Sequence, residues 1–416
     1  MTDVHRTIAA IFRIESAKIV GALLRMLGDV GLAEELAQDT LVVALESWTK
    51  SGVPENPGAW LMATAKRRAI DALRRSRLVD RKHGELARGQ EEAEEPDLDS
   101  APDDVVNDDL LRLIFAACHP VLSTEARVAL TLPLLGGLTT DEVARAFLAP
   151  EATIAQRIVR AKRTLAEKRV EFEIPRGAEL TVRLPSVLEV IYLVFNEGYS
   201  ATAGDDWVRP GLCEDALRLG RILAELAPDQ PEVHGLVALM ELQASRLRAR
   251  TDASGAPVLL LDQDRSRWDH LLIQRGFHAL ERAERLGGVD GPYALQAAIA
   301  ACHARARTAA ETDWARIAAL YERLARVAPS PVIELNRAVA VSMAAGPAAA
   351  LPIVDALASD VSLARYHLLP SVRGDLLVKL GRKSEARAEF ERAASLTRNS
   401  RERALLLERA AACGGG

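Results

Sequence analysis

Aromatic residues make up only 4% of this 416-residue sequence, and cysteine occurs only four times. The scarcity of aromatic residues, together with abundant alanine, leucine and arginine, favours helices over sheets. Cys118, Cys213, Cys302 and Cys413 lie far apart and form no C-x-x-C pair. They indicate neither a disulfide framework nor a zinc site, so we expect a protein of the reducing cytoplasm with no metal and no other cofactor.

The sequence also lacks a long apolar run and an excess of positive charge. The longest uncharged segment, Ala338 to Val354, is too short to span a bilayer and is interrupted by glycine and proline. Charged residues such as Arg6 and Arg13 interrupt the N-terminus, so no signal peptide is expected. Because the formal net charge is −5, any surface for nucleic acid must be local. The length predicts two to four domains.

Two helices are predicted before residue 50. Apolar residues recur at helical spacing through residues 5 to 27, and Gly28-Asp29 ends that helix. The second helix, AEELAQDTLVVALESW, has acidic and amide side chains near its N-terminus, where the helix macrodipole favours acids. Such a cluster is either simply solvated or a docking surface for a basic partner.

A third helix is predicted from about Ala59, after the loop TKSGVPENPG. Between Trp60 and Lys82, eight lysines and arginines oppose two aspartates, which gives a local charge of +6. A basic helix face beside a tryptophan suits binding of single-stranded nucleic acid. A solvated charged helix is the alternative. Residues 91 to 109 then contain ten acidic residues and no lysine or arginine, which predicts a flexible acidic linker, and helices resume at about Asp108.

The segment from Thr139 to Lys168 has the pattern of a helix-turn-helix. Thr139 and Glu142 fit a capping box, so a short helix is predicted to begin there. Pro150 interrupts it, and a second helix restarts near Glu151. In DNA-binding proteins of this kind the second helix enters the major groove. An ordinary helical hairpin with a solvated basic face remains the alternative. The predicted apolar face of the second helix consists of Ile154, Ile158, Ala161 and Leu165.

Helical patterns with short breaks continue to the end of the chain. The segment LLVKLGRKSEARAEFERAASL has the small-residue pattern of a tetratricopeptide repeat, which predicts stacked helical pairs in a solenoid. Two polar segments, Asn196–Ala201 and Leu261–Asp269, lie between helices. They indicate either a ligand or partner site, or helix caps and ion pairs. No nucleophile, phosphate loop or metal-ligand spacing accompanies them, so catalysis is not expected. The predicted helices are 186–196, 212–227, 231–249, 267–286, 291–306, 313–327, 331–345, 347–358, 362–380, 383–396 and 400–412.

The order of these segments resembles the bacterial extracytoplasmic-function (ECF) sigma factors of the sigma-70 family, in the subgroup with a tetratricopeptide-like C-terminal extension. LAEELAQDTLVVALESW resembles the segment that binds core RNA polymerase. NPGAWLMATAKRRAIDALRR resembles the segment that melts and reads the −10 element. LTLPLLGGLTTDEVARAF and EATIAQRIVRAKRTL resemble the −35 reader. The resemblance covers roughly residues 5 to 170.

This resemblance implies an all-α fold with two small DNA-binding modules, an acidic linker and an α-solenoid-like C-terminal domain. It also implies a function without catalysis, namely binding core RNA polymerase and directing promoter-specific transcription initiation in the cytoplasm, away from membranes. A protein partner or ligand would bind the solenoid. The alternative is a stand-alone helix-turn-helix regulator with an effector-binding solenoid, which the acidic linker disfavours. The implied segments are sigma region 2 (1–85), the acidic linker (86–107), region 4 (108–172), a second linker (173–185) and the regulatory domain (186–413).

The resemblance also implies roles for individual residues. The loop before the third helix would hold a base flipped out of the −10 strand. The family often has asparagine where this chain has Arg67, which leaves the −10 sequence preference open. Residues facing core polymerase would be Glu35, Gln38 and Asp39. Residues at the −10 element would be Asn56, Trp60, Lys66, Arg67, Arg68, Arg74 and Arg75. At the −35 element, Ala155, Gln156, Val159 and Arg160 would face base edges, and Arg157, Lys162 and Arg163 would bind phosphates.

Overall fold

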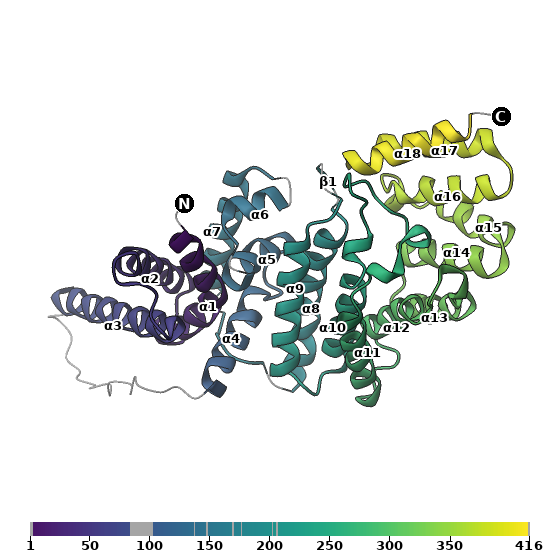
Figure 1. Ribbon diagram of the computed structural model, residues 1–416. Coiled ribbons are helices and arrows are strands. Elements are labelled where there is room, and N and C mark those ends of the chain that lie inside the picture. Colours follow the sequence, from purple (N-terminus) through teal and green to yellow (C-terminus); the bar gives the residue numbers. More distant parts are fainter. Residues whose placement is uncertain are drawn as a thin grey trace. The chain divides into compact units, whose positions relative to one another are not determined.

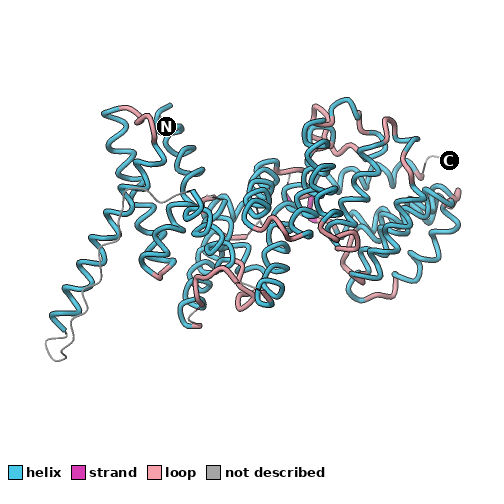
Figure 2. The backbone as a smooth tube through the Cα atoms, turned by 90° about the horizontal axis from the view of Figure 1, so that it is seen from below, coloured by secondary structure: helices cyan, strands magenta, loops and turns pink. Residues whose placement is uncertain are grey.

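The computed structural model describes residues 3–83, 103–136, 138–146, 149–168, 170–175, 177–201, 203–204 and 207–414. Nearly all of this part of the chain is helical, which confirms the predicted all-α class (Figures 1 and 2). The chain divides into two compact units, Met1–Val190 and Ile191–Gly416. Within the described residues, no helix is both long enough and apolar enough to cross a membrane.

The first module of the N-terminal unit consists of α1 (Asp3–Leu27), α2 (Val30–Ser51) and α3 (Pro57–His83). Helix α1 packs against both α2 and α3. Asp29 separates α1 from α2 and caps α2, because its carboxylate accepts a hydrogen bond from the backbone N–H of Leu32 at 2.8 Å. The core between the helices includes Leu23 and Trp48, which are 0% and 2% exposed.

The second module contains α4 (Asp103–Ala117), α5 (Thr124–Thr131), a π-helical turn (Leu132–Gly136), α6 (Thr140–Ala146) and α7 (Glu151–Glu167). Helices α5 and α6 both pack against α7, and α4 packs against α1 of the first module. Helix α4 begins at Asp103, earlier than the predicted start near Asp108. The remainder of the predicted acidic linker, residues 86–102, lies outside the described residues.

Helix α8 (Ala178–Tyr199) corrects the expectation of a linker over residues 173–185, because it begins inside that segment and continues through Pro185. Arg183 donates a 2.9 Å hydrogen bond to the backbone oxygen of Phe115 in α4. Arg127 of α5 forms a 3.0 Å ion pair with Glu189. These contacts hold the first half of α8 against the second module and offset the backbone hydrogen bond that proline cannot make.

In the C-terminal unit, each helix from α9 to α18 packs against the next helix in sequence, which is the arrangement of a solenoid. A two-residue parallel pair, β1 (Ala203–Gly204) with β2 (Arg398–Asn399), joins its first and last parts. Short 3₁₀ turns cover Leu247–Ala249, Leu260–Asp262, Arg265–Arg267, Ala309–Glu311 and Val361–Leu363. The helices are α9 (Pro210–Leu226), α10 (Pro231–Ala244), α11 (His270–Arg285), α12 (Pro292–Arg305), α13 (Trp314–Val327), α14 (Pro331–Ala345), α15 (Pro347–Leu357), α16 (Leu368–Lys379), α17 (Lys383–Leu396) and α18 (Ser400–Ala412).

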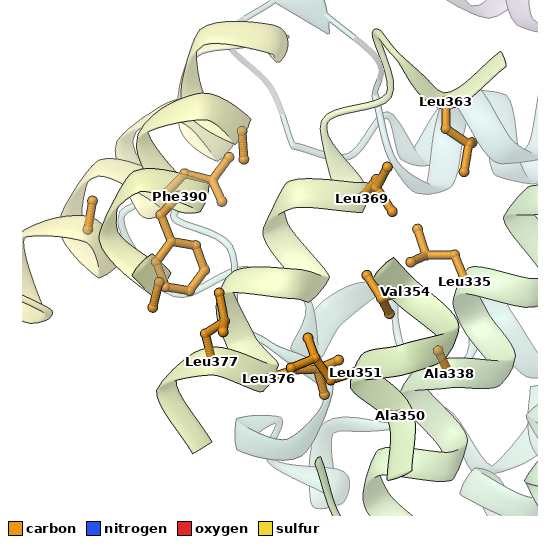
Figure 3. Close-up of a cluster of buried hydrophobic side chains, with 14 of the residues drawn as sticks. Leu335, Ala338, Ala350, Leu351, Val354, Leu363, Leu369, Leu376, Leu377 and Phe390 are labelled. Carbon is orange, nitrogen blue, oxygen red and sulfur yellow. The ribbon is translucent and has the colours of Figure 1, made fainter. Parts of the chain in front are cut away.

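The tetratricopeptide-like segment forms α16 and α17, and its small residues allow close packing. Phe390 of α17 is 1% exposed, and a side chain at Gly374 of α16 would come within 2.8 Å of its ring. Figure 3 shows the apolar side chains that converge from α14 to α17. The helix predicted over 362–380 begins only at Leu368, so that Pro370 falls in its first turn, where the missing N–H costs no helical hydrogen bond.

Candidate nucleic-acid interface

Helix α7 buries one stripe of apolar residues and leaves its opposite side in solvent. Ile154, Ile158, Ala161 and Leu165 are each 8% exposed or less, as the helical spacing predicted. Because these residues pack on α5 and α6, the helix has one outward face. That face consists of Ala155, Gln156, Arg157, Val159, Arg160 and Arg163, all of them exposed.

The cations of α7 differ in the partners they have. Arg157 and Arg160 have no ion-pair partner among the described residues. Arg163 forms an ion pair with Glu167 at 3.1 Å, and both side chains are exposed. Lys162 is half-buried and pairs with Glu34 of α2 in the first module. In this conformation, therefore, Lys162 faces a carboxylate of its own chain, whereas Arg157 and Arg160 face solvent.

Helix α3 presents the cations predicted to bind the −10 element along its first five turns. Arg67, Arg74 and Arg75 are exposed, and Lys66 and Arg68 are half-buried. The Nε of Arg75 donates to the backbone oxygen of Asp71 at 3.2 Å, which holds its side chain along the helix. The face is thus cationic and accessible, as a phosphate-binding surface requires.

The start of α3 is fixed by a cap and by an aromatic pair. Asn56 accepts a 3.1 Å hydrogen bond from the backbone N–H of Ala59, so it caps the helix while remaining exposed. Trp60 packs edge-to-face against the buried Trp48, with ring centroids 5.1 Å apart. Since Trp60 is only half-buried, Trp48 supports a ring that still has an accessible side.

The predicted polymerase-binding residues lie on α2, next to the basic helix. Glu35 and Gln38 are exposed. Asp39 is half-buried and forms an ion pair with Arg68 of α3. The structure therefore joins a predicted polymerase contact and a predicted DNA contact in one pair, which the sequence did not indicate.

A pocket of about 540 Å³, open to solvent, lies between the two modules. The first module contributes residues of α1 and α2 to its wall, including Glu34 and Gln38. The second module contributes residues between Pro133 and Thr140. Of the three residues predicted to bind polymerase, Gln38 thus borders the second module in this conformation.

A second contact between the modules was also missed by the sequence analysis. Asp109 of α4 is 2% exposed and binds Arg25 of α1 at 3.2 Å and Arg112 at 3.3 Å. In the sequence Asp109 is one of ten acids in the apparent linker, and composition alone cannot distinguish it from its solvated neighbours. The helical spacing of the apolar residues of α4, extended backwards to Asp109, was the only feature of the sequence that could have indicated its burial.

Comparisons with known proteins give separate matches for the two modules and for part of the C-terminal half of the chain. Residues 11–79 match the family model of sigma-70 region 2, and residues 112–165 match that of sigma-70 region 4. Residues 183–284 match a family of unknown function, DUF6596. The first match covers α2 and most of α3, and the second covers the helix-turn-helix.

The relatives that are similar to this chain include the following three. An uncharacterized protein of Rhizobium meliloti (strain 1021) is 44% identical over 388 residues, which is 93% of this chain and 91% of the relative. The ECF RNA polymerase sigma factor SigK of Mycobacterium sp. (strain KMS) is 30% identical over 154 residues, which is 36% of this chain and 76% of SigK. SigK of Mycolicibacterium vanbaalenii is 32% identical over 157 residues, covering 36% of this chain and 75% of that protein.

Both sigma regions thus occur in the predicted order, each on a helical module with an accessible basic face, and the similarity to SigK extends over three quarters of that protein. The interpretation of the helix-turn-helix as a DNA reader is thereby confirmed. The chain belongs to the ECF RNA polymerase sigma factors, which act with core polymerase to direct transcription initiation at promoters.

Proposed function

We propose that α7 lies in the major groove of the −35 element, with Gln156 and Arg160 bonding to base edges. Glutamine and arginine are suited to adenine and guanine edges respectively, and an aliphatic side chain suits the methyl group of thymine. Val159 supports this proposal because it is 65% exposed between these two polar residues, with Ala155 alongside. Arg157, Arg163 and Lys162 would bind phosphates, which sets register without reading sequence.

We propose that α3 holds the melted −10 strand. Trp60 would stack at the edge of the open duplex, since its ring is only partly covered by Trp48. The loop that ends at Asn56 would accept a flipped base. The cations of α3, namely Lys66, Arg67, Arg68, Arg74 and Arg75, would bind the backbone of the strand.

We propose that Glu35, Gln38 and Asp39 on α2 bind core polymerase in the cytoplasm. Gln38 also borders the pocket between the modules, so a partner as large as polymerase requires the second module to move away. The same movement would release Lys162 from Glu34 and make it available to DNA. Binding of core polymerase and exposure of α7 would therefore be coupled through this contact.

The C-terminal unit is proposed to be a regulatory domain that binds a partner or ligand and changes the availability of the two modules. Its stacked helices support this role, because solenoids provide extended binding surfaces. A truncation that tests it should end after Val190, since the first half of α8 packs against α4 and α5. Equal promoter activity of residues 1–190 and the full chain under all conditions would contradict a regulatory role of the C-terminal unit.

Run-off transcription with the full chain, core polymerase and a promoter library tests the proposed residue roles. The exposed recognition face of α7 is the observation that supports them most directly. We expect a cognate −35 sequence to emerge, and we expect Gln156→Ala to relax the preference at one base pair. Tight binding of duplex DNA without polymerase, and no effect on core enzyme, would instead support a stand-alone regulator.

A further inference from the structure

Two polar segments that the sigma-factor function does not explain come together in the C-terminal unit. Tyr199 lies at the end of α8, and Trp268 follows the 3₁₀ turn Arg265–Arg267. Between these aromatic rings lie arginines from the turn that follows α10. The guanidinium of Arg250 is 3.8 Å from the ring centre of Tyr199 and 5.4 Å from that of Trp207. The guanidinium of Arg246 is 5.8 Å from Tyr199 and 5.7 Å from Trp268.

These two arginines are unusual because no carboxylate within the described part of the chain lies at ion-pair distance from either of them. Arg246 is only 6% exposed, and its one side-chain hydrogen bond goes to the amide oxygen of Gln243. Burial lowers the pKa of the Arg246 guanidinium, and the charge of Arg250 lowers it further. Stacking on aromatic rings offsets only part of the cost of burying a cation.

Other buried or half-buried arginines of this protein have acidic partners. Arg209 binds Glu197 at 2.6 Å, and Arg221 binds Glu241 at 2.8 Å. The nearby Arg265 also has no carboxylate at ion-pair distance among the described residues, but it donates to the backbone oxygens of His303 and Ala306 at 2.6 and 2.7 Å and to Thr312. Arg265 is therefore a structural arginine with neutral acceptors.

The Nε atoms of Arg246 and Arg250 are both buried without a hydrogen-bond partner among the described residues. The Nε atoms of Arg68, Arg127 and Arg183 are unpartnered in the same way, but each of these three arginines has an acidic partner. Neutral polar groups beside them are also unsatisfied. The indole N–H of Trp268 and Nδ1 of His303 are buried and have no partner within the described residues. Burial, followed by the charges of Arg246 and Arg265, lowers the pKa of His303 to about 3, so its ring is neutral near pH 7. A neutral imidazole beside cations can donate a hydrogen bond without adding charge. Within the described residues, the cluster thus combines two cations that have no carboxylate partner with two further ring nitrogens.

Burial decides what size of ligand fits. Arg246, Trp268 and His303 are all less than 8% exposed and form the inner part of the cluster. Tyr199, Trp207 and Arg250 are half-buried and form its outer part. These exposures favour a small molecule, which can contact the partly exposed outer residues, over a peptide or a nucleic acid, whose bulk cannot reach the inner ones. The aromatic rings would then face the organic part of such a molecule.

We propose that Arg246 and Arg250, with Tyr199, Trp207, Trp268 and His303, form a binding site for the phosphate group of a small organic phosphate monoester. Two guanidinium groups match the two negative charges of a phosphate monoester, and their planar forks suit its oxygens. Trp268 and His303 supply further donors. The site goes beyond the promoter-binding function and does not depend on it, because its occupancy can be measured without polymerase or DNA.

The test is a titration of the full chain with phenyl phosphate, followed by tryptophan fluorescence and by the thermal unfolding midpoint. We expect saturable binding with a dissociation constant below about 1 mM and a higher unfolding midpoint when the ligand is bound. Inorganic phosphate should compete for the site. Benzoate, which carries one negative charge, should bind about tenfold more weakly or worse. Benzoate that binds as tightly as phenyl phosphate would overturn the assignment to phosphate.

Arg248, two residues before Arg250, provides a matched control for substitutions in the site. Arg250→Gln should weaken phenyl phosphate binding about tenfold or more, whereas Arg248→Gln, at an exposed arginine of the same turn, should leave it unchanged. Equal losses in the two variants, or no saturable binding to the parent chain, would overturn the proposal. Arg250 is half-buried, so its replacement tests the site even if substitutions at Arg246 prevent folding.

Arg246→Met separates a binding role from a structural one. Replacing an uncompensated buried cation by an apolar side chain of similar length should maintain or raise the unfolding midpoint of the ligand-free protein. The same variant should lose the shift that phenyl phosphate produces. A lowered midpoint without ligand, with the phosphate-induced shift retained, would show that Arg246 only supports the packing of Tyr199 and Trp268.

Discussion

Replacing Arg157 by alanine should change how promoter binding depends on salt. Arg157 is exposed on α7 and has no ion-pair partner among the described residues, so the variant removes one complete phosphate contact if α7 lies in the groove. Each such contact contributes about 0.9 to the slope of log affinity against log salt concentration. Between about 50 and 200 mM salt, the ratio of parent to variant affinity should therefore fall by about 3.5-fold. Because the side chain is exposed, folding stability should change by less than about 0.5 kcal/mol.

The assay is promoter binding by the holoenzyme, assembled from core polymerase and the full chain, over a series of salt concentrations. Arg157→Lys is the matched control, because it keeps the charge and should keep the slope. Arg163→Ala should change the slope by less than Arg157→Ala, since Arg163 already shares its charge with Glu167 at 3.1 Å. A slope for Arg157→Ala equal to that of the parent would refute the placement of α7. A larger change in slope for Arg163→Ala than for Arg157→Ala would also refute it.

Three further predictions concern the packing of the chain. Lys162→Ala should raise affinity for core polymerase, measured without DNA, by about twofold to fivefold, because it removes a partly exposed ion pair that holds the modules together. Lys168 is exposed, so Lys168→Ala should leave the affinity for core polymerase unchanged. Equal effects of the two substitutions would contradict a role of the Lys162 ion pair in holding the modules together. Arg221→Ala removes the cation that pairs with the 2% exposed Glu241; because the Arg221 side chain is itself 39% exposed, the loss should be about 1–3 kcal/mol of unfolding free energy at neutral pH. Burial raises the pKa of Glu241, so the deficit should shrink as the pH falls and the carboxylate becomes protonated; equal deficits in urea melts at about pH 5 and pH 8 would contradict this. Phe390→Ala should cost about 3–5 kcal/mol in the same assay, because the ring is buried against Gly374 and Leu377, and a loss below about 1 kcal/mol would contradict the packing in Figure 3.

Local features of the sequence were sufficient to predict most helices and the outward face of α7. Its buried residues recur three or four positions apart, and that spacing places side chains on one side of any helix. Pro150 interrupts the chain whatever surrounds it, because its ring restricts its own backbone and that of the preceding residue. The exposure of Gln156, Val159 and Arg160 follows from the same geometry, since the opposite side of the helix is buried.

The C-terminal helices were predictable for the same reason, with errors where tertiary contacts outweigh a local signal. The second linker was predicted to extend to residue 185, yet α8 begins earlier and continues through Pro185 because Arg183 and Glu189 bind α4 and α5. The helix predicted from residue 362 begins later, at a position where Pro370 falls in its first turn.

Pairings between distant residues were decided only by the tertiary structure. The sequence shows that Lys162 is basic and Glu34 acidic, but not that they meet across 128 positions. It also shows two polar segments in the C-terminal unit, but not that Arg246 and Arg250 lie between aromatic rings with no carboxylate of the described residues at ion-pair distance. The physical reason is that periodicity records which side of a helix is buried, whereas the partner of a charged group depends on how separate helices pack. Thus the sequence by itself determined the helices and the recognition face, and the packing decided which charges are paired and which remain available for a ligand.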